Sequence, residues 1–191
     1  MSDLFRYEGD DWLESHLFDR RVVVLRGPLD AGAATRVASK LMTLDATSDD
    51  AVQLQVDSPG GGLEAGFAVI DVIDAMGVAV EAVCMGRVEG TAVAVAAVCG
   101  RRSALAHAQF RLVDPDVEVA GRASELEALV AHHRGALARF HERLAQAVGR
   151  SEEVLGADCR RGLYLSAAEA LRYGLVDKII DRRRPIRPLR S

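Results

Sequence analysis

Apolar positions along the chain alternate between strand-type and helix-type spacing. Val22 to Leu25 is a short apolar run stopped by Gly27-Pro28, which is typical of a buried strand. In chain order the pattern predicts a strand over 22–25, a helix over 31–44, a strand over 52–56, a helix over 67–76, a strand over 78–85 and a helix over 90–98. This alternation predicts an α/β fold with parallel βαβ units.

A different pattern begins after residue 122. Ser124 and Glu127 have capping-box spacing, and an apolar stripe follows at helical intervals over about 25 residues. The stripe consists of Leu126, Leu129, Val130, His133, Leu137, Phe140, Leu144 and Val148. We expect this long helix to project and to pack on another subunit; the alternative is that it covers its own sheet.

The C-terminal part contains a second capping box and a basic tail. Ser166 and Glu169 open a short helix that Gly174 closes, and 175–180 is predicted to be the last strand. We predict a single domain over 1–181, with a short N-terminal arm over 1–16 and the long-helix region over about 116–148. The five arginines of 182–191 are expected to form a disordered tail, with binding to an acidic partner as the alternative.

Composition narrows the classes of function. The 191 residues carry a formal net charge of -4, which gives no electrostatic reason to expect nucleic acid as the main partner. No apolar run approaches the roughly 18 to 20 residues of a membrane span, and the acidic first residues do not resemble a signal peptide. Cys84, Cys99 and Cys159 are odd in number and widely spaced, which favours reduced thiols over disulfides or zinc. We therefore expect a cytoplasmic location and no membrane partner.

The segment Asp57 to Gly62 reads Asp-Ser-Pro-Gly-Gly-Gly between a strand and a helix. Alone it is a tight turn, and it lacks the Lys-Ser/Thr of a phosphate loop. Its setting is more specific, because Leu165 to Ala170 reads Leu-Ser-Ala-Ala-Glu-Ala and Tyr173 to Asp177 reads Tyr-Gly-Leu-Val-Asp. From about Leu17 to Ile180 this order of motifs resembles the proteolytic subunit of Clp protease. The resemblance implies the Clp and crotonase-like fold of stacked ββα units with a protruding handle helix.

The resemblance also implies a serine peptidase with a Ser-His-Asp triad, but this chain lacks all three residues. The nucleophile position holds Gly90, the general-base position holds Val113, and the position of the aspartate holds Gly162. None of these side chains can attack a carbonyl, move a proton or orient a histidine. The sequence thus predicts a catalytically inactive subunit with a structural or regulatory role in a Clp-type proteolytic ring.

Two alternatives would still give this chain a catalytic activity. Thr91 could act as a displaced nucleophile with Asp114 as a weak base. Glu89 could instead do acid-base work beside an oxyanion hole, as glutamates do in crotonase-like acyl-CoA enzymes. The backbone amides of Gly60 and Thr91 match the oxyanion-hole positions that the resemblance implies. The plainer interpretation of Glu89 is that it points to solvent or pairs with Arg87 or Arg111.

No cofactor or metal is expected. His132 and His133 are adjacent on a helix and therefore face different directions, which is a poor arrangement for a metal ion. The Clp resemblance implies homo- or hetero-oligomers with Clp-type subunits and an AAA+ unfoldase as a further partner. The residues assigned to the ring-ring interface are Leu129, His133, Leu137, Phe140, Arg160 and Arg161. Where the family has an acid-arginine pair, this chain has two arginines, which favours a partner ring that offers carboxylates.

Overall fold

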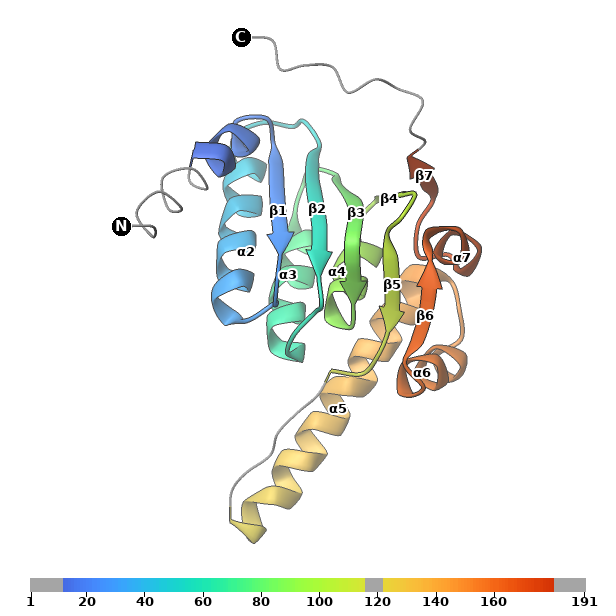
Figure 1. Ribbon diagram of the computed structural model, residues 1–191. Helices are drawn as coiled ribbons and strands as arrows, with labels where there is room; N and C mark the ends of the chain where they lie inside the picture. The colour runs from blue at the N-terminus through green and yellow to red at the C-terminus, as the bar shows by residue number, and fades with distance from the viewer. Residues whose placement is uncertain (1–11, 116–121, 181–191) are drawn as a thin grey trace, which may run out of the picture.

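The computed structural model describes residues 12–115 and 122–180 (Figure 1), so residues 116–121 at the start of the predicted long-helix region and the basic tail lie outside the described residues. The strands are β1 (Val22–Arg26), β2 (Val52–Ser58), β3 (Val80–Glu89), β4 (Arg101–Leu105), β5 (Gln109–Leu112), β6 (Leu163–Ser166) and β7 (Lys178–Ile180). The helices are α2 (Ala31–Asp45), α3 (Leu63–Ala75), α4 (Thr91–Ala97), α5 (Ala123–Val148), α6 (Glu152–Arg160) and α7 (Ala167–Tyr173). A helical segment over 12–18 precedes β1. The α/β class predicted from the sequence is confirmed.

The sheet divides at β3. Strands run in the order β1-β2-β3-β4-β7, and every pairing along this path is parallel. The first half of β3 pairs with β4, whereas Arg87 to Glu89 pair with β5, which in turn pairs antiparallel with β6. Gly86 has a φ of 56° at this division, a conformation that glycine adopts at no steric cost. β3 is therefore longer than the predicted 78–85, and its far end delivers residues 87–90 to β5.

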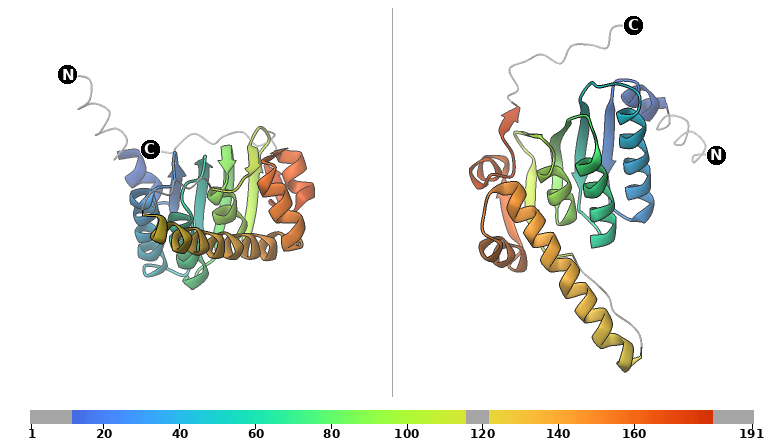
Figure 2. Two further views of the ribbon diagram at one scale, coloured as in Figure 1. Left: turned by 90° about the horizontal axis from the view of Figure 1, so that it is seen from below. Right: turned by 180° about the vertical axis from the view of Figure 1, so that it is seen from behind.

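The core lies between the sheet and a row of helices on one face of it (Figure 2). Helix α4 lies deepest, and all seven of its residues are buried. Its alanines, together with Val93 and Val95, keep it thin enough to pack on the sheet with α3 and α5 beside it. The run of small residues that the sequence shows over 91–97 is thus a packing feature.

Helix α5 is buried at one end and exposed at the other. Phe140 is 2% exposed and Leu144 is fully buried, whereas Leu129 is 43% exposed and Val130 is 37% exposed. The helix projects beyond the sheet in Figures 1 and 2. It begins at Ala123 after the N-cap Arg122, whose N–H donates to the Glu125 carboxylate at 3.4 Å. The capping box predicted at Ser124 and Glu127 was wrong, because the helix starts earlier.

Arg102 ties the C-terminal elements together. Its guanidinium donates to the carbonyl oxygens of Ala147 and Gly174 at 3.1 and 3.0 Å, and to both carboxylate oxygens of Asp177. The side-chain hydrogen bond from Arg102, together with its backbone N–H, lowers the pKa of Asp177 below its ordinary value. The same residue therefore holds the ends of α5 and α7 and the start of β7.

Replacing Asp177 should produce a stability difference that depends on pH. Because the pKa is lowered in the folded state, the stabilisation is present above the ordinary Asp range, near about 4. It is lost as pH falls through that range towards the folded-state pKa. The melting temperature of Asp177→Asn should thus lie below that of the wild type at pH 7, and the gap should narrow at about pH 3. A gap that stays constant with pH would contradict this account.

None of the helices within the described residues is long and apolar enough to cross a membrane.

Candidate functional site

The turn from β3 into α4 is held in an unusual backbone conformation. Gly90 is the N-cap of α4 with φ 51° and ψ −124°, and its N–H donates to the carbonyl oxygen of Arg111 at 3.0 Å. A residue with a side chain is strained at such a φ, and glycine is not. A sharp strand-to-helix turn of this kind is where many hydrolases hold a nucleophile. Here the turn is present and the side chain is not.

The three positions that the resemblance assigns to a triad lie around β5. A Cβ added to Gly90 would be 3.7 Å from Cγ1 of Val113, which follows β5 directly. A Cβ added to Gly162 would be 3.4 Å from Nη2 of Arg111 on β5. The strand pairs β3–β5 and β5–β6 bring these segments together. The three positions converge, and none of them carries a reactive group.

Ionic contacts surround Glu89, next to this turn. Its carboxylate is 3.6 Å from Nε of Arg87 and 3.9 Å from Nη1 of Arg111, and its side chain is 14% exposed. The Arg111 guanidinium also lies over the ring of Tyr164, 4.9 Å from the ring centroid. Glu89 therefore makes the paired arrangement with Arg87 and Arg111 that was the plainer alternative to acid-base chemistry.

Hydrogen bonds connect Thr91 to the glycine turn. The Thr91 hydroxyl accepts a hydrogen bond from the N–H of Gly61 at 2.9 Å and lies 3.2 Å from the Gly61 carbonyl oxygen, with the residue 1% exposed. The N–H of Gly60 donates to Oγ of Ser58 at 3.0 Å. The Thr91 hydroxyl is thus buried and occupied, and the Gly60 amide already has an acceptor. This geometry gives both residues a structural role in the turn.

Thr91→Val should lower the free energy of unfolding by about 0.5–1.5 kcal/mol, because the N–H of Gly61 loses its acceptor in a part-buried hydrogen bond. Thr91→Ser keeps the hydroxyl and should cost clearly less. Urea unfolding of the two variants measures the difference. Equal stability of both variants would show that the hydrogen bond to Gly61 contributes nothing.

His141 and Asp114 form a pair beside position 113 that the sequence did not predict. Nε2 of His141 on α5 is 2.7 Å from Oδ1 of Asp114, and His141 is 7% exposed. Cys159 on α6 lies against the pair. His141 lies four residues after Leu137 and three before Leu144, so helical spacing already placed it on the apolar side.

The residues assigned to the ring-ring interface have different surroundings. Leu129 is exposed, and His133 and Leu137 are half-buried, but Phe140 lies in the subunit's own core. Phe140 therefore has almost no surface to offer a partner. Phe140 is therefore removed from the predicted interface, and the other five residues stay a prediction.

The two arginines at the end of α6 also differ. Both are exposed, but Arg161, the C-cap of α6, pairs with Asp158 of that helix at 2.8 Å, and Arg160 forms no ion pair within the described residues. The chain itself supplies the carboxylate that was expected from a partner ring, because Asp158 lies one helical turn before Arg161. Only Arg160 is then left to attract a carboxylate from a partner ring.

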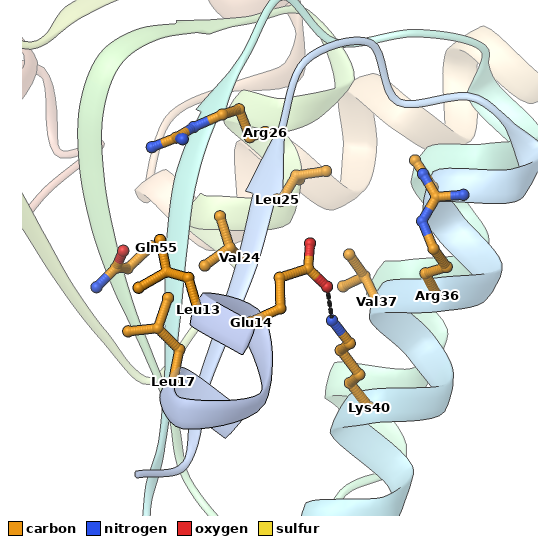
Figure 3. A pocket seen from close by; sticks show the side chains of 11 residues that line it. Leu13, Glu14, Leu17, Val24, Leu25, Arg26, Arg36, Val37, Lys40 and Gln55 are labelled. Carbon is orange, nitrogen blue, oxygen red and sulfur yellow. Dashed lines mark hydrogen bonds and ion pairs between the residues drawn. The ribbon is translucent and has the colours of Figure 1, made fainter. Parts of the chain in front are cut away.

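A separate hollow of about 300 Å³ lies at the other end of the sheet (Figure 3). The helical segment over 12–18 covers it with Leu13 and Leu17, and Arg36 and Lys40 line it from α2. Glu14 and Lys40 form an ion pair across it, 2.5 Å apart. β1 is separated from β3 by β2, so this hollow is not part of the Gly90 site.

Comparison with known families decides the classification. The family model described as Clp protease matches residues 8–183, which is most of the chain. The chain belongs to the Clp protease family. The resemblance seen in the glycine turn and in the C-terminal motifs is thereby confirmed, as is the fold with its protruding helix. Clp family membership implies, in general terms, assembly into Clp-type oligomers.

Proposed function

We propose that this Clp family protein is a catalytically inactive subunit with a structural or regulatory role in a Clp-type proteolytic ring. The observation that carries the proposal is the convergence of Gly90, Val113 and Gly162 on β5 without a nucleophile, a base or an orienting acid. A serine peptidase needs all three functions at one point.

The surroundings of these positions support the proposal. Arg111 lies against Gly162, so a cation stands beside the place where the triad would need its aspartate. The two candidate groups nearby already have partners. The Thr91 hydroxyl is hydrogen-bonded to Gly61, and the Glu89 carboxylate pairs with Arg87 and Arg111. Asp114, the weak base of the displaced-nucleophile alternative, is likewise engaged, by His141 at 2.7 Å.

The features that this chain keeps from the Clp family are those that serve assembly of subunits. Helix α5 keeps 26 residues and exposes Leu129 and Val130 on the part that projects from the subunit. Two exposed apolar side chains on the projecting part of a helix support a contact with another subunit there. A ring made only of this chain would have no triad, so a role in proteolysis requires catalytic Clp subunits in the same assembly.

A covalent probe tests the missing chemistry. Intact-mass spectrometry after treatment with a fluorophosphonate, which modifies activated serine nucleophiles, should give the unmodified mass of this chain. A catalytically competent Clp subunit treated in parallel is the positive control. Stoichiometric labelling of this chain would refute the proposal, and peptide mapping would then identify the nucleophile.

A further inference from the structure

Three side chains that can bind a metal meet at the base of α5. Asp114 follows β5, His141 lies on α5 and Cys159 lies on α6. One ligand atom from each, namely a carboxylate oxygen, a ring nitrogen and the sulfur, lies within 4.8 Å of the other two. His141 and Cys159 are buried, and the Asp114 side chain is 24% exposed. The cluster thus joins three separate elements and remains open on the aspartate side.

The donor set matches one class of ion. A thiolate, an imidazole and a carboxylate are all common zinc ligands, whereas Mg²⁺ and Ca²⁺ prefer oxygen alone. Tetrahedral Zn²⁺ bonds of about 2.0–2.3 Å place ligand atoms about 3.3–3.8 Å apart. The separations in the cluster, all within 4.8 Å, would have to shorten to this range, and the 2.7 Å contact between His141 and Asp114 would have to open.

The local electrostatics favour a cation. Burial, together with the charges of Asp114 and Asp158 and against the opposing effect of Arg160, raises the pKa of the Cys159 thiol to about 12. The carboxylates of Asp114 and Asp158 attract a divalent ion to this cluster, and an ion bound there would stabilise the Cys159 thiolate. The metal-free protein then carries Cys159 as a thiol, which loses its proton to solvent when the ion binds.

Neighbouring groups limit the site to three protein ligands. The Asp158 carboxylate accepts a hydrogen bond from the Tyr173 hydroxyl at 2.7 Å and pairs with Arg161. It is therefore already partnered. Gly156 lets α6 approach the other ring nitrogen, because an added Cβ there would be 3.3 Å from Nδ1 of His141. The fourth position is left for water.

We propose that Asp114, His141 and Cys159 form a Zn²⁺ site that fastens the base of the long helix α5 to the segment after β5 and to α6. This departs from the sequence expectation of no metal, which rested on the wide spacing of the cysteines. Asp114 and His141 are 27 residues apart, so no local ligand motif exists to be recognised. The site is independent of the proposed role in the ring.

Cobalt titration tests the site directly. The full-length protein, purified without a histidine tag, is titrated with Co²⁺, which replaces Zn²⁺ and gives a near-ultraviolet absorption band when a thiolate binds it. We expect one Co²⁺ per chain, with the thiolate band present. Cys159→Ser should abolish the band, and Asp114→Asn and His141→Asn should each weaken binding by about tenfold or more. Cys84→Ser and His133→Asn are matched controls elsewhere in the fold and should bind as the wild type does.

Thermal unfolding with Zn²⁺ provides the second measurement. Zn²⁺ should raise the melting temperature of the wild type and of Cys84→Ser, because an ion that binds the folded state stabilises it. It should leave the melting temperature of Asp114→Asn nearly unchanged. No Co²⁺ uptake by the wild type, or uptake with a thiolate band that Cys159→Ser retains, would overturn the proposal. In that case Asp114 and His141 form a plain ion pair.

Discussion

Phe140→Ala should lower the free energy of unfolding by about 3–5 kcal/mol, the usual cost of removing a buried aromatic ring. Phe140 is 2% exposed and lies at the inner end of α5, where that helix packs on the core. Losing its ring leaves a cavity that the neighbouring helices fill only in part. Urea or thermal unfolding at one fixed protein concentration measures the loss.

Leu129→Ala is the matched control on the same helix. Because Leu129 is 43% exposed, its truncation should change the stability of the subunit fold by less than about 0.5 kcal/mol. Equal losses in the two variants would contradict the division of α5 into a core half and an exposed half.

The second large effect concerns assembly. The double variant Leu129→Asp with Val130→Asp should form no higher oligomers, because it puts two charges into a surface that is apolar in the wild type. Its far-ultraviolet circular dichroism should match the wild type, since neither side chain belongs to the core. Size-exclusion chromatography with light scattering measures the mass.

A conservative pair keeps that prediction falsifiable. Leu129→Met with Val130→Ile retains the apolar surface and should assemble as the wild type does. If the aspartate variant assembles normally, the outer half of α5 is not the contact surface. If it loses its secondary structure, these residues support the fold instead.

Periodicity predicted the inner framework well. Val22–Arg26, Ala31–Asp45 and Val52–Ser58 follow the predicted elements within one or two residues. Each has a regular alternation or a helical stripe of apolar residues because it is half-buried against one core. The capping box at Ser166 and Glu169 was also confirmed, with the Glu169 N–H 3.4 Å from the Ser166 hydroxyl oxygen.

The elements around the site were harder to predict. Strands β4, β5 and β6 are only four or five residues long, and β4 and β5 contain arginines, so these strands carry no clear alternation. Their strand geometry comes from pairing with β3 and with each other. The Arg102 to Asp177 link joins residues 75 apart, which no local pattern encodes.

The same limit applies to the site. Motif order placed Gly90, Val113 and Gly162, and the structure brings them together at β5. The order of motifs could not predict that the Thr91 hydroxyl would accept a hydrogen bond from Gly61, nor that His141 would pair with Asp114. The stripe on α5 likewise showed an apolar face without showing that Phe140 faces the core and Leu129 faces outward.

Native mass spectrometry after co-expression with a catalytically competent Clp subunit tests the central claim most directly. The proposed role predicts mixed rings of fixed stoichiometry that contain both chains, and the Leu129 and Val130 aspartate variant should be absent from them. Two separate populations, with this chain found only in oligomers of its own, would contradict a structural or regulatory role in a proteolytic ring.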